Sequence, residues 1–331
     1  MTFTRSAEQQ QFASSLHDLL AAARVPGAAR RWAGGDHSPG LALWRKLAGL
    51  GVTALAVPPR CGGLGASWLD VVIACEELGH HAMPGPVAES AAAVPELIAA
   101  LADERLSARW LPGLAAGDLI ATLALPPWLP YAADAGAAGL VLLAGPGAVR
   151  LATAGTRHRS VDPARSLSQA RGREVLARGP AVAGAVARAR EAGTLACAAQ
   201  LLGAGRALLE ASVSHARQRS QFGRAIGSFQ AVKHQLAGVA IGLEFARPLL
   251  DAAAATLTPR DVSAAKVACT GAAQRAARAA LQVHGAIGYT EEHDLHLWLT
   301  KVRALAGAWG SQAGRRARVM AAVADGGLAW S

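Results

Sequence analysis

The feature that most constrains the fold is the segment at residues 216–234, with the sequence ARQRSQFGRAIGSFQAVKH. Its basic start ends one helical pattern, the glycines allow a short turn, and the residues that follow begin a second helical pattern. Long helices are expected at about residues 192–219, from 228 to past 245, and at 263–284. Pro248 is expected to kink or end the second of them. Helices of this length predict a C-terminal helical bundle.

A second segment, residues 282–297, has the sequence QVHGAIGYTEEHDLHL. It ends a helix with an alanine-rich face, and Gly285 stands where a residue of left-handed conformation would terminate that helix. Glycine there also removes a side chain, so backbone can approach a flat, bulky cofactor. One glycine cluster alone predicts only a helix end, but its pairing with the first segment predicts a site.

The N-terminal third carries a third pattern, with Gly62-Gly63-Leu64-Gly65-Ala66-Ser67 followed by Glu76-Glu77-Leu78-Gly79. Ser67 and Asp70 have the spacing of a capping box, and Gly79 is placed to stop the helix that this box begins. Taken locally, the pattern predicts a capped core helix whose two glutamates are solvated or paired.

These three segments together resemble the acyl-CoA dehydrogenase family, including its R-x-x-F-G-x-x-I-x-x-F-Q-x-x-x-H and Q-x-x-G-G-x-G-Y-T-x-E patterns. The resemblance implies FAD as cofactor, with Arg219 reaching the diphosphate of a neighbouring subunit's FAD. A guanidinium suits this role because it is always charged and presents a planar fork of donors. For Arg217 a solvated helix face is the simpler interpretation. The cofactor-binding candidates are Arg219, Phe222, Gln230, Gln282 and Gly285.

The order of helical and extended patterns predicts a mainly α fold with a small β middle domain. We expect an N-terminal helical domain at residues 1–118, a reduced β-domain at 119–180 and a helical-bundle domain at 181–331. Strands are expected at 119–125, 139–144, 149–152 and 175–177, between proline and glycine breaks. This order matches the acyl-CoA dehydrogenase architecture. If the strands are misassigned, a plain helical bundle is the alternative.

Composition excludes several classes of protein. The chain has 331 residues and is 52% hydrophobic, yet shows no long uninterrupted apolar run of the kind that spans a membrane. Its first amphipathic helix, at about 6–24, lacks the features of a secretion signal. Four scattered cysteines predict buried thiols in a reducing cytoplasm. The formal charge of +10 is spread along the chain, which argues against nucleic-acid binding and favours steering of an anionic coenzyme A ester.

The resemblance also implies a catalytic base, which the sequence does not supply at either usual position. Family members remove an α-proton with a carboxylate held in a water-poor pocket. One version has it in an E-G-T-like turn, where this chain has Trp309; another has it at the position of Gly193. Gln200 is an amide and cannot serve. Glu191 is the nearest carboxylate, the alternative being an exposed glutamate at a flexible helix start, so the base stays unknown.

The middle segment also lacks a counterpart of the family's flavin-contacting loop, and Trp128 there either stacks on a ring or packs. The chain keeps the motifs that, in the family, contact the FAD of a neighbouring subunit, but it lacks much of what binds its own FAD. This combination predicts a subunit of a hetero-oligomer. The expected activity is α,β-dehydrogenation of an acyl-CoA to a 2-enoyl-CoA, with a longer acyl-CoA dehydrogenase or a second copy as partner and an electron-transfer flavoprotein as acceptor. The alternatives are a non-catalytic structural subunit and an autonomous homodimeric enzyme that uses Glu191.

Overall fold

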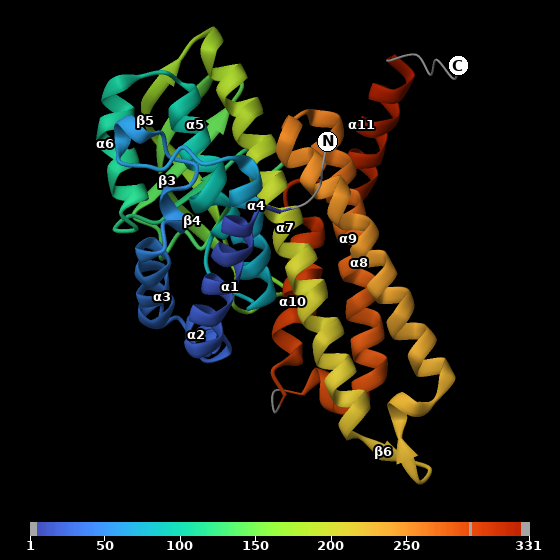
Figure 1. Cartoon of the computed structure of the whole chain (residues 1–331). Helices are drawn as coiled ribbons and strands as arrows, with labels where there is room; N and C mark the ends of the chain where they lie inside the picture. The colour runs from blue at the N-terminus through green and yellow to red at the C-terminus, as the bar shows by residue number, and fades with distance from the viewer. Residues whose placement is uncertain (1–4, 291–292, 326–331) are drawn as a thin grey trace.

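The computed structural model describes residues 5–290 and 293–325. A group of helices and a sheet lie on one side of the molecule, and long helices form a bundle on the other (Figure 1). The N-terminal helices are α1 (Ala7–Ala22), α2 (Val25–Ala33), α3 (Ser38–Gly49), α4 (Trp68–His80), α5 (Val94–Ala100) and α6 (Glu104–Ala115). Shorter turns are η1 (Val52–Ala54), η2 (Pro59–Cys61), the π-helical η3 (Glu89–Ala93), η4 (Ile226–Ser228) and η5 (Gly285–Tyr289).

Local sequence signals set the starts of the N-terminal helices. Ser6 caps α1, and Ser67 forms the predicted capping box with Asp70 at the start of α4. The prediction that Gly79 stops α4 is wrong, because the helix passes through it to His80. Gly79 instead allows α4 to touch α7, since a Cβ there would lie 2.1 Å from the carbonyl oxygen of Gln200.

The middle segment forms one mixed sheet, so the fold is not a plain helical bundle. Its strands are β1 (Ala121–Ala124), β2 (Ala132–Ala133), β3 (Leu140–Gly145), β4 (Ala148–Arg159) and β5 (Ser166–Arg178), in the order β1-β3-β4-β5-β2. β1 pairs with β3 in parallel, and the other pairs are antiparallel. β4 and β5 are longer than predicted because their outer halves are exposed and rich in arginine, which hides the apolar pattern of a strand.

The C-terminal bundle consists of α7 (Pro180–Gln218), α8 (Gln230–Thr256), α9 (Pro259–His284), α10 (Leu295–Gly307) and α11 (Gln312–Asp325). The hairpin of β6 (Ser220–Gln221) and β7 (Arg224–Ala225) joins α7 to α8 at the lower tip of the bundle in Figure 1. α8 does not end at Pro248, which lies inside it. The mainly α fold with a small middle sheet is therefore confirmed.

α7 is the central helix of the molecule. It is long and apolar enough to cross a membrane, but 89% of its most apolar window is buried, as in the core helix of a soluble protein. Its Gly203 meets α4 so closely that a Cβ there would lie 1.8 Å from the carbonyl oxygen of Glu76. The four cysteines are buried and free, as predicted.

A buried carboxylate links these parts through charge. Glu76 is fully buried and pairs with Arg5 at 2.6 Å, with Arg206 of α7 at 2.7 Å and with Arg247 of α8 at 2.8 Å. Burial alone would raise the pKa of this carboxyl, but the hydrogen bonds and charge of Arg247, with the charges of Arg206 and Arg5, lower it to about 2. Glu76 therefore stays ionised and ties the N-terminal segment and α4 to the bundle.

Candidate cofactor site

Three of the five cofactor candidates come together at the tip of the bundle. Arg219, Gln282 and Gly285 line a pocket of about 490 Å³ between the end of α7, the β6–β7 hairpin and the end of α9. The arrangement combines a guanidinium, an amide and an open stretch of backbone, which are groups that suit a diphosphate. The full lining is His215, Arg219, Gln221, Ile226, Gln282, Val283, His284, Gly285, Ala286 and Ile287.

Local backbone geometry places these groups. α7 ends at Gln218, and Arg219 leaves it in an extended conformation, so its side chain starts beyond the last helical turn. Gly285 ends α9 with a φ of 65° and has open space where a Cβ would stand. Glycine reaches this φ without the steric cost that other residues incur. The helix end predicted at Gly285 is therefore present, and its backbone is free to approach a ligand.

The other two candidates lie outside this pocket as the described residues define it. The Phe222 side chain is 89% exposed and stands edge-on to Phe229, with ring centroids 6.1 Å apart. Gln230 is exposed at the first position of α8. Glu291 and Glu292, which belong to the second sequence motif, lie outside the described residues.

Sequence reasoning missed two histidines of the pocket. His215 and His284 stack with ring centroids 4.3 Å apart, and burial is the first cause that lowers the pKa of each. Both rings are therefore neutral at pH 7, which leaves Arg219 as the charged side chain of the lining. The signal for His215 was its spacing, because it lies one helical turn before Arg219.

The two positions where the family resemblance places a base meet in space. Trp309 is buried, and a Cβ added to Gly193 would lie only 2.3 Å from the Trp309 ring. The indole therefore occupies the space above Gly193, and neither position offers a carboxylate. This contact explains why a residue without a side chain stands in the middle of α7 at this point.

The turn that carries Trp309 is held under strain by a buried arginine. Trp309 has a φ of 59°, which is uncommon for a bulky residue. Arg315 donates through Nε to the Trp309 carbonyl at 3.1 Å and through Nη2 to Thr194 Oγ1 at 2.6 Å. Burial lowers the pKa of Arg315 to about 10, so it stays charged at neutral pH. The surroundings thus fix the indole in place.

Glu191 is not an exposed glutamate, so that expectation is wrong. It is buried, and Arg318 and Arg190 bind its Oε1 at 2.8 and 2.9 Å, while Arg315 lies 3.6 Å from Oε2. Both hydrogen bonds go to Oε1, while Oε2 is buried without a hydrogen-bond partner among the described residues. Arg190 also lies 4.7 Å over the ring of Trp128, so that indole packs against an arginine.

A different carboxyl group, Glu89, lies beside the closed base position. It belongs to the π-helical turn η3 and is buried. Burial raises the pKa of Glu89, while the charge of Arg165 and a contact from the Trp309 side chain act in the opposite direction. No spacing in the sequence pointed to it, because it is an isolated acid in an alanine-rich segment.

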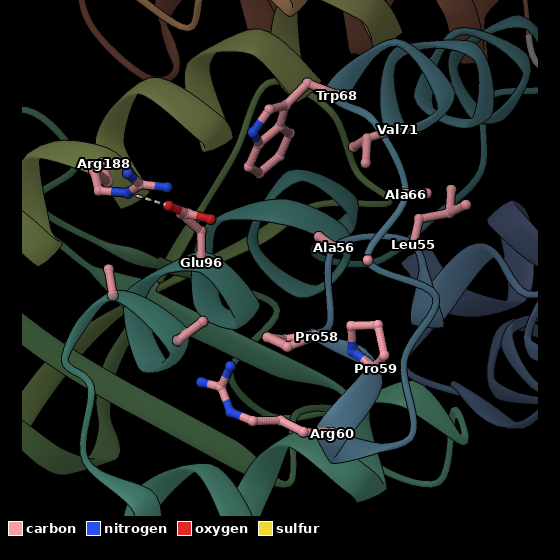
Figure 2. A pocket seen from close by; sticks show the side chains of 13 residues that line it. Leu55, Ala56, Pro58, Pro59, Arg60, Ala66, Trp68, Val71, Glu96 and Arg188 are labelled. Carbon is pink, nitrogen blue, oxygen red and sulfur yellow. Dashed lines mark hydrogen bonds and ion pairs between the residues drawn. The ribbon is translucent and has the colours of Figure 1, made fainter.

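A second hollow of about 490 Å³ lies between the loop at residues 55–66, α4, α5 and the start of α7. Figure 2 shows Trp68 and the ion pair of Arg188 with Glu96 in its wall. Its lining in the described chain contains none of the cofactor candidates. The candidate cofactor groups are therefore concentrated at the bundle tip.

Comparisons with known proteins agree with this architecture. Residues 6–118 match the N-terminal domain of acyl-CoA dehydrogenases, and residues 183–324 match the C-terminal domain. The chain is 32% identical over 302 residues to the acyl-CoA dehydrogenase IpdE2 of Mycobacterium tuberculosis, covering 89% of this chain and 90% of that protein. The chain therefore belongs to the acyl-CoA dehydrogenase family, whose members are FAD-dependent oxidoreductases.

Solved structures show the same fold at low identity. A glutaryl-coenzyme A dehydrogenase in complex with glutaryl-CoA superimposes with a TM-score of 0.86 at 20% identity, covering 97% of this chain and 96% of that one. The ChsE4–ChsE5 complex from Mycobacterium tuberculosis gives a TM-score of 0.82 at 24% identity, covering 98% and 99%.

Proposed function

We propose that this chain is one subunit of a hetero-oligomeric, FAD-dependent acyl-CoA dehydrogenase. In the complex it lends the Arg219 pocket to a flavin site completed by a longer partner subunit. The complex oxidises an acyl-CoA thioester to the 2-enoyl-CoA and passes the electrons to an electron-transfer flavoprotein in the cytoplasm. The partner supplies the catalytic base.

One observation carries this proposal: the closed base position and the open pocket lie far apart on one rigid helix. At a rise of about 1.5 Å per residue, Gly193 and the C-terminal end of α7 are about 38 Å apart. The Trp309 indole fills the space at the first point, while Arg219 lines an open pocket at the second. Because one flavin cannot serve both places, this separation supports a role for Arg219 at an active centre other than the closed one.

The outer face of α8 supports an assembly with another chain. Ile241, Phe245 and Leu249 are 56%, 75% and 44% exposed and follow each other at four-residue spacing, so they form an apolar stripe. Exposed apolar patches of this kind mark protein–protein contacts. The likeness to one chain of the ChsE4–ChsE5 complex, a structure of two named proteins, favours an unequal partner.

When bound, FAD supplies the acceptor for the hydride that leaves the β-carbon. This chain's contribution is positional. Arg219 provides a charge-assisted fork of donors to a diphosphate, and Gln282 provides an amide at the same pocket. Gly285 allows close approach of backbone. These groups bind and orient; the α-proton is taken by a residue outside this chain.

The test is FAD affinity of the chain co-expressed with a longer acyl-CoA dehydrogenase from the same genome. Arg219→Ala removes a hydrogen bond to a charged group, worth about 1.5–3 kcal/mol, so FAD affinity is expected to fall about 10- to 150-fold. Arg217→Ala is the matched control, because Arg217 is an exposed arginine two residues earlier, in the last turn of α7, and does not line the pocket.

Equal FAD affinity in the two variants would exclude this role for Arg219. A homodimer that binds FAD fully and is active on its own would instead establish the autonomous enzyme. A complex whose turnover does not change when the chain's pocket is altered, while its stability depends on the chain, would establish a purely structural subunit.

A further inference from the structure

Three histidines and a glutamate gather where α1 meets α4, on elements that take no part in the cofactor pocket. We call this group the histidine cluster; its members are His17, Glu77, His80 and His81. One ligand atom from each lies within 4.8 Å of those of the other three. Three members follow one another on α4 and its cap at spacings of three and four residues, so they share one helix face, and the fourth comes from α1.

One ring nitrogen of His17 has two close polar neighbours, and a single hydrogen bond cannot satisfy both. Its Nδ1 lies 3.0 Å from Oε2 of Glu77 and 3.2 Å from Nε2 of His81. A ring nitrogen carries either one proton or one lone pair. If Nδ1 of His17 carries a proton, it can donate well to only one of these two acceptors. If it carries no proton, its lone pair faces the carboxylate oxygen of Glu77, which is repulsive. A cation between the three atoms satisfies all of them, because each then acts as a lone-pair donor.

The remaining atoms of the cluster are arranged as in a metal site with an ordered surround. Nε2 of His80 lies 2.8 Å from Glu210 of α7, while its Nδ1 is buried and has no hydrogen-bond partner among the described residues. A carboxylate that holds the second nitrogen of a ligating histidine is the usual arrangement around protein-bound metals. Arg206 binds Oε1 of Glu77, which leaves Oε2 for a cation.

The two ligand-atom distances at His17 fit a small tetrahedral ion. Zinc bonds to histidine nitrogen and carboxylate oxygen at about 2.0–2.2 Å, which places neighbouring tetrahedral ligand atoms about 3.3 Å apart. The contacts of 3.0 and 3.2 Å at His17 are close to this spacing. Imidazole ligands favour zinc and similar transition ions over magnesium and calcium, which take oxygen ligands.

The cluster is accessible from the side of His17. The His17 side chain is 41% exposed, and with Glu77 it lines a surface hollow of about 460 Å³. Three arginines border the same hollow: Arg5, Arg206 and Arg247 pair with Glu76, and Arg206 also binds Glu77.

We propose that the histidine cluster binds one divalent cation of the zinc class as a structural site. The ion takes four ligands, three imidazole nitrogens and one carboxylate oxygen, and so joins α1 to α4. With no open ligand position, it has no part in the redox chemistry. The site is independent of the proposed role at Arg219, since it uses other residues.

The test titrates the full-length chain, stripped with a chelator, with Zn²⁺ and with Co²⁺. Calorimetry is expected to give one Zn²⁺ per chain, and Co²⁺ is expected to show the intense visible absorption of tetrahedral coordination. His17→Ala removes a ligand from the less buried side, so it is least damaging to folding. Its Zn²⁺ affinity is expected to fall at least about 100-fold, beyond the usual effect of losing an outer partner. His234→Ala, an exposed histidine of α8, is the control.

A second measurement covers variants that fold poorly. The melting temperature of the parent chain is expected to rise with added Zn²⁺, because a ligand that binds only the folded state stabilises it, and this rise is expected to vanish in His17→Ala and His81→Gln. No Zn²⁺ binding by the parent chain, equal affinity in His17→Ala and His234→Ala, or a thiolate-to-cobalt absorption band would each overturn the proposal.

Discussion

Replacing Glu76 by glutamine is expected to destabilise the chain more than any surface substitution. The change keeps the shape of the side chain but removes its charge; Arg5 and Arg247 lose their carboxylate partner, and Arg206 keeps only Glu77. Removing one partner from a buried ion pair costs about 3–5 kcal/mol. The pKa gives a similar figure: a carboxyl lowered from 4.5 to about 2 contributes about 3 kcal/mol at neutral pH.

The sign of the pH dependence follows from the lowered pKa. Because the folded-state pKa lies below the unfolded one, the contribution is complete above pH 4.5 and is lost as the pH falls towards 2. Between pH 7 and pH 4 the stability difference between the parent chain and Glu76→Gln is expected to shrink by about 1 kcal/mol.

The assay is urea unfolding at both pH values. The free energy of unfolding is the midpoint urea concentration multiplied by the dependence of that free energy on urea concentration. Glu174→Gln is the control, because Glu174 is exposed on β5. If Glu76→Gln unfolds at the same urea concentration as the control, or if the difference grows at pH 4, the arginines do not hold Glu76 as described.

Three further substitutions test the other features. Trp309→Ala is expected to cost about 3–5 kcal/mol in urea unfolding, because it empties the space above Gly193, and a cost below 1 kcal/mol would show that the indole is not packed there. Glu191→Gln is expected to leave turnover of an active complex nearly unchanged; loss of a general base costs about 10²–10⁴-fold, so a fall of that size with FAD content preserved would identify Glu191 as the base. Phe245→Asp is expected to weaken assembly, since a charge then interrupts the α8 stripe; light scattering that shows an unchanged oligomer would place the interface elsewhere.

Local signals account for what the sequence predicted correctly. The capping box at Ser67 and the glycine at the end of α9 set a helix start and a helix end through residues one or two turns away. Such local effects can be predicted from the sequence. The outer parts of β4 and β5 were missed because exposed, arginine-rich strands lack an apolar alternation.

Errors at the site arose from partners that are distant in sequence. Glu191 was expected to be exposed, yet Arg315 and Arg318, from the C-terminal helix α11, enclose it. Trp309 touches Gly193 because α7 packs against the turn before α11. Sequence spacing cannot predict this packing, since the two residues are far apart in the chain. The family resemblance pointed to both positions, but only the structure shows that they are one place.

The contact between Trp309 and Gly193 also affects whether a carboxylate base could be introduced at position 309. A glutamate put back at position 309 would leave a void where the indole packs, and would meet the buried acid Glu89. Arg315 would still hold the turn through its hydrogen bond to the backbone carbonyl of residue 309. Restoring a working carboxylate thus requires several coordinated substitutions, each unfavourable alone. The packed indole thus opposes the return of a carboxylate at position 309 by any single substitution.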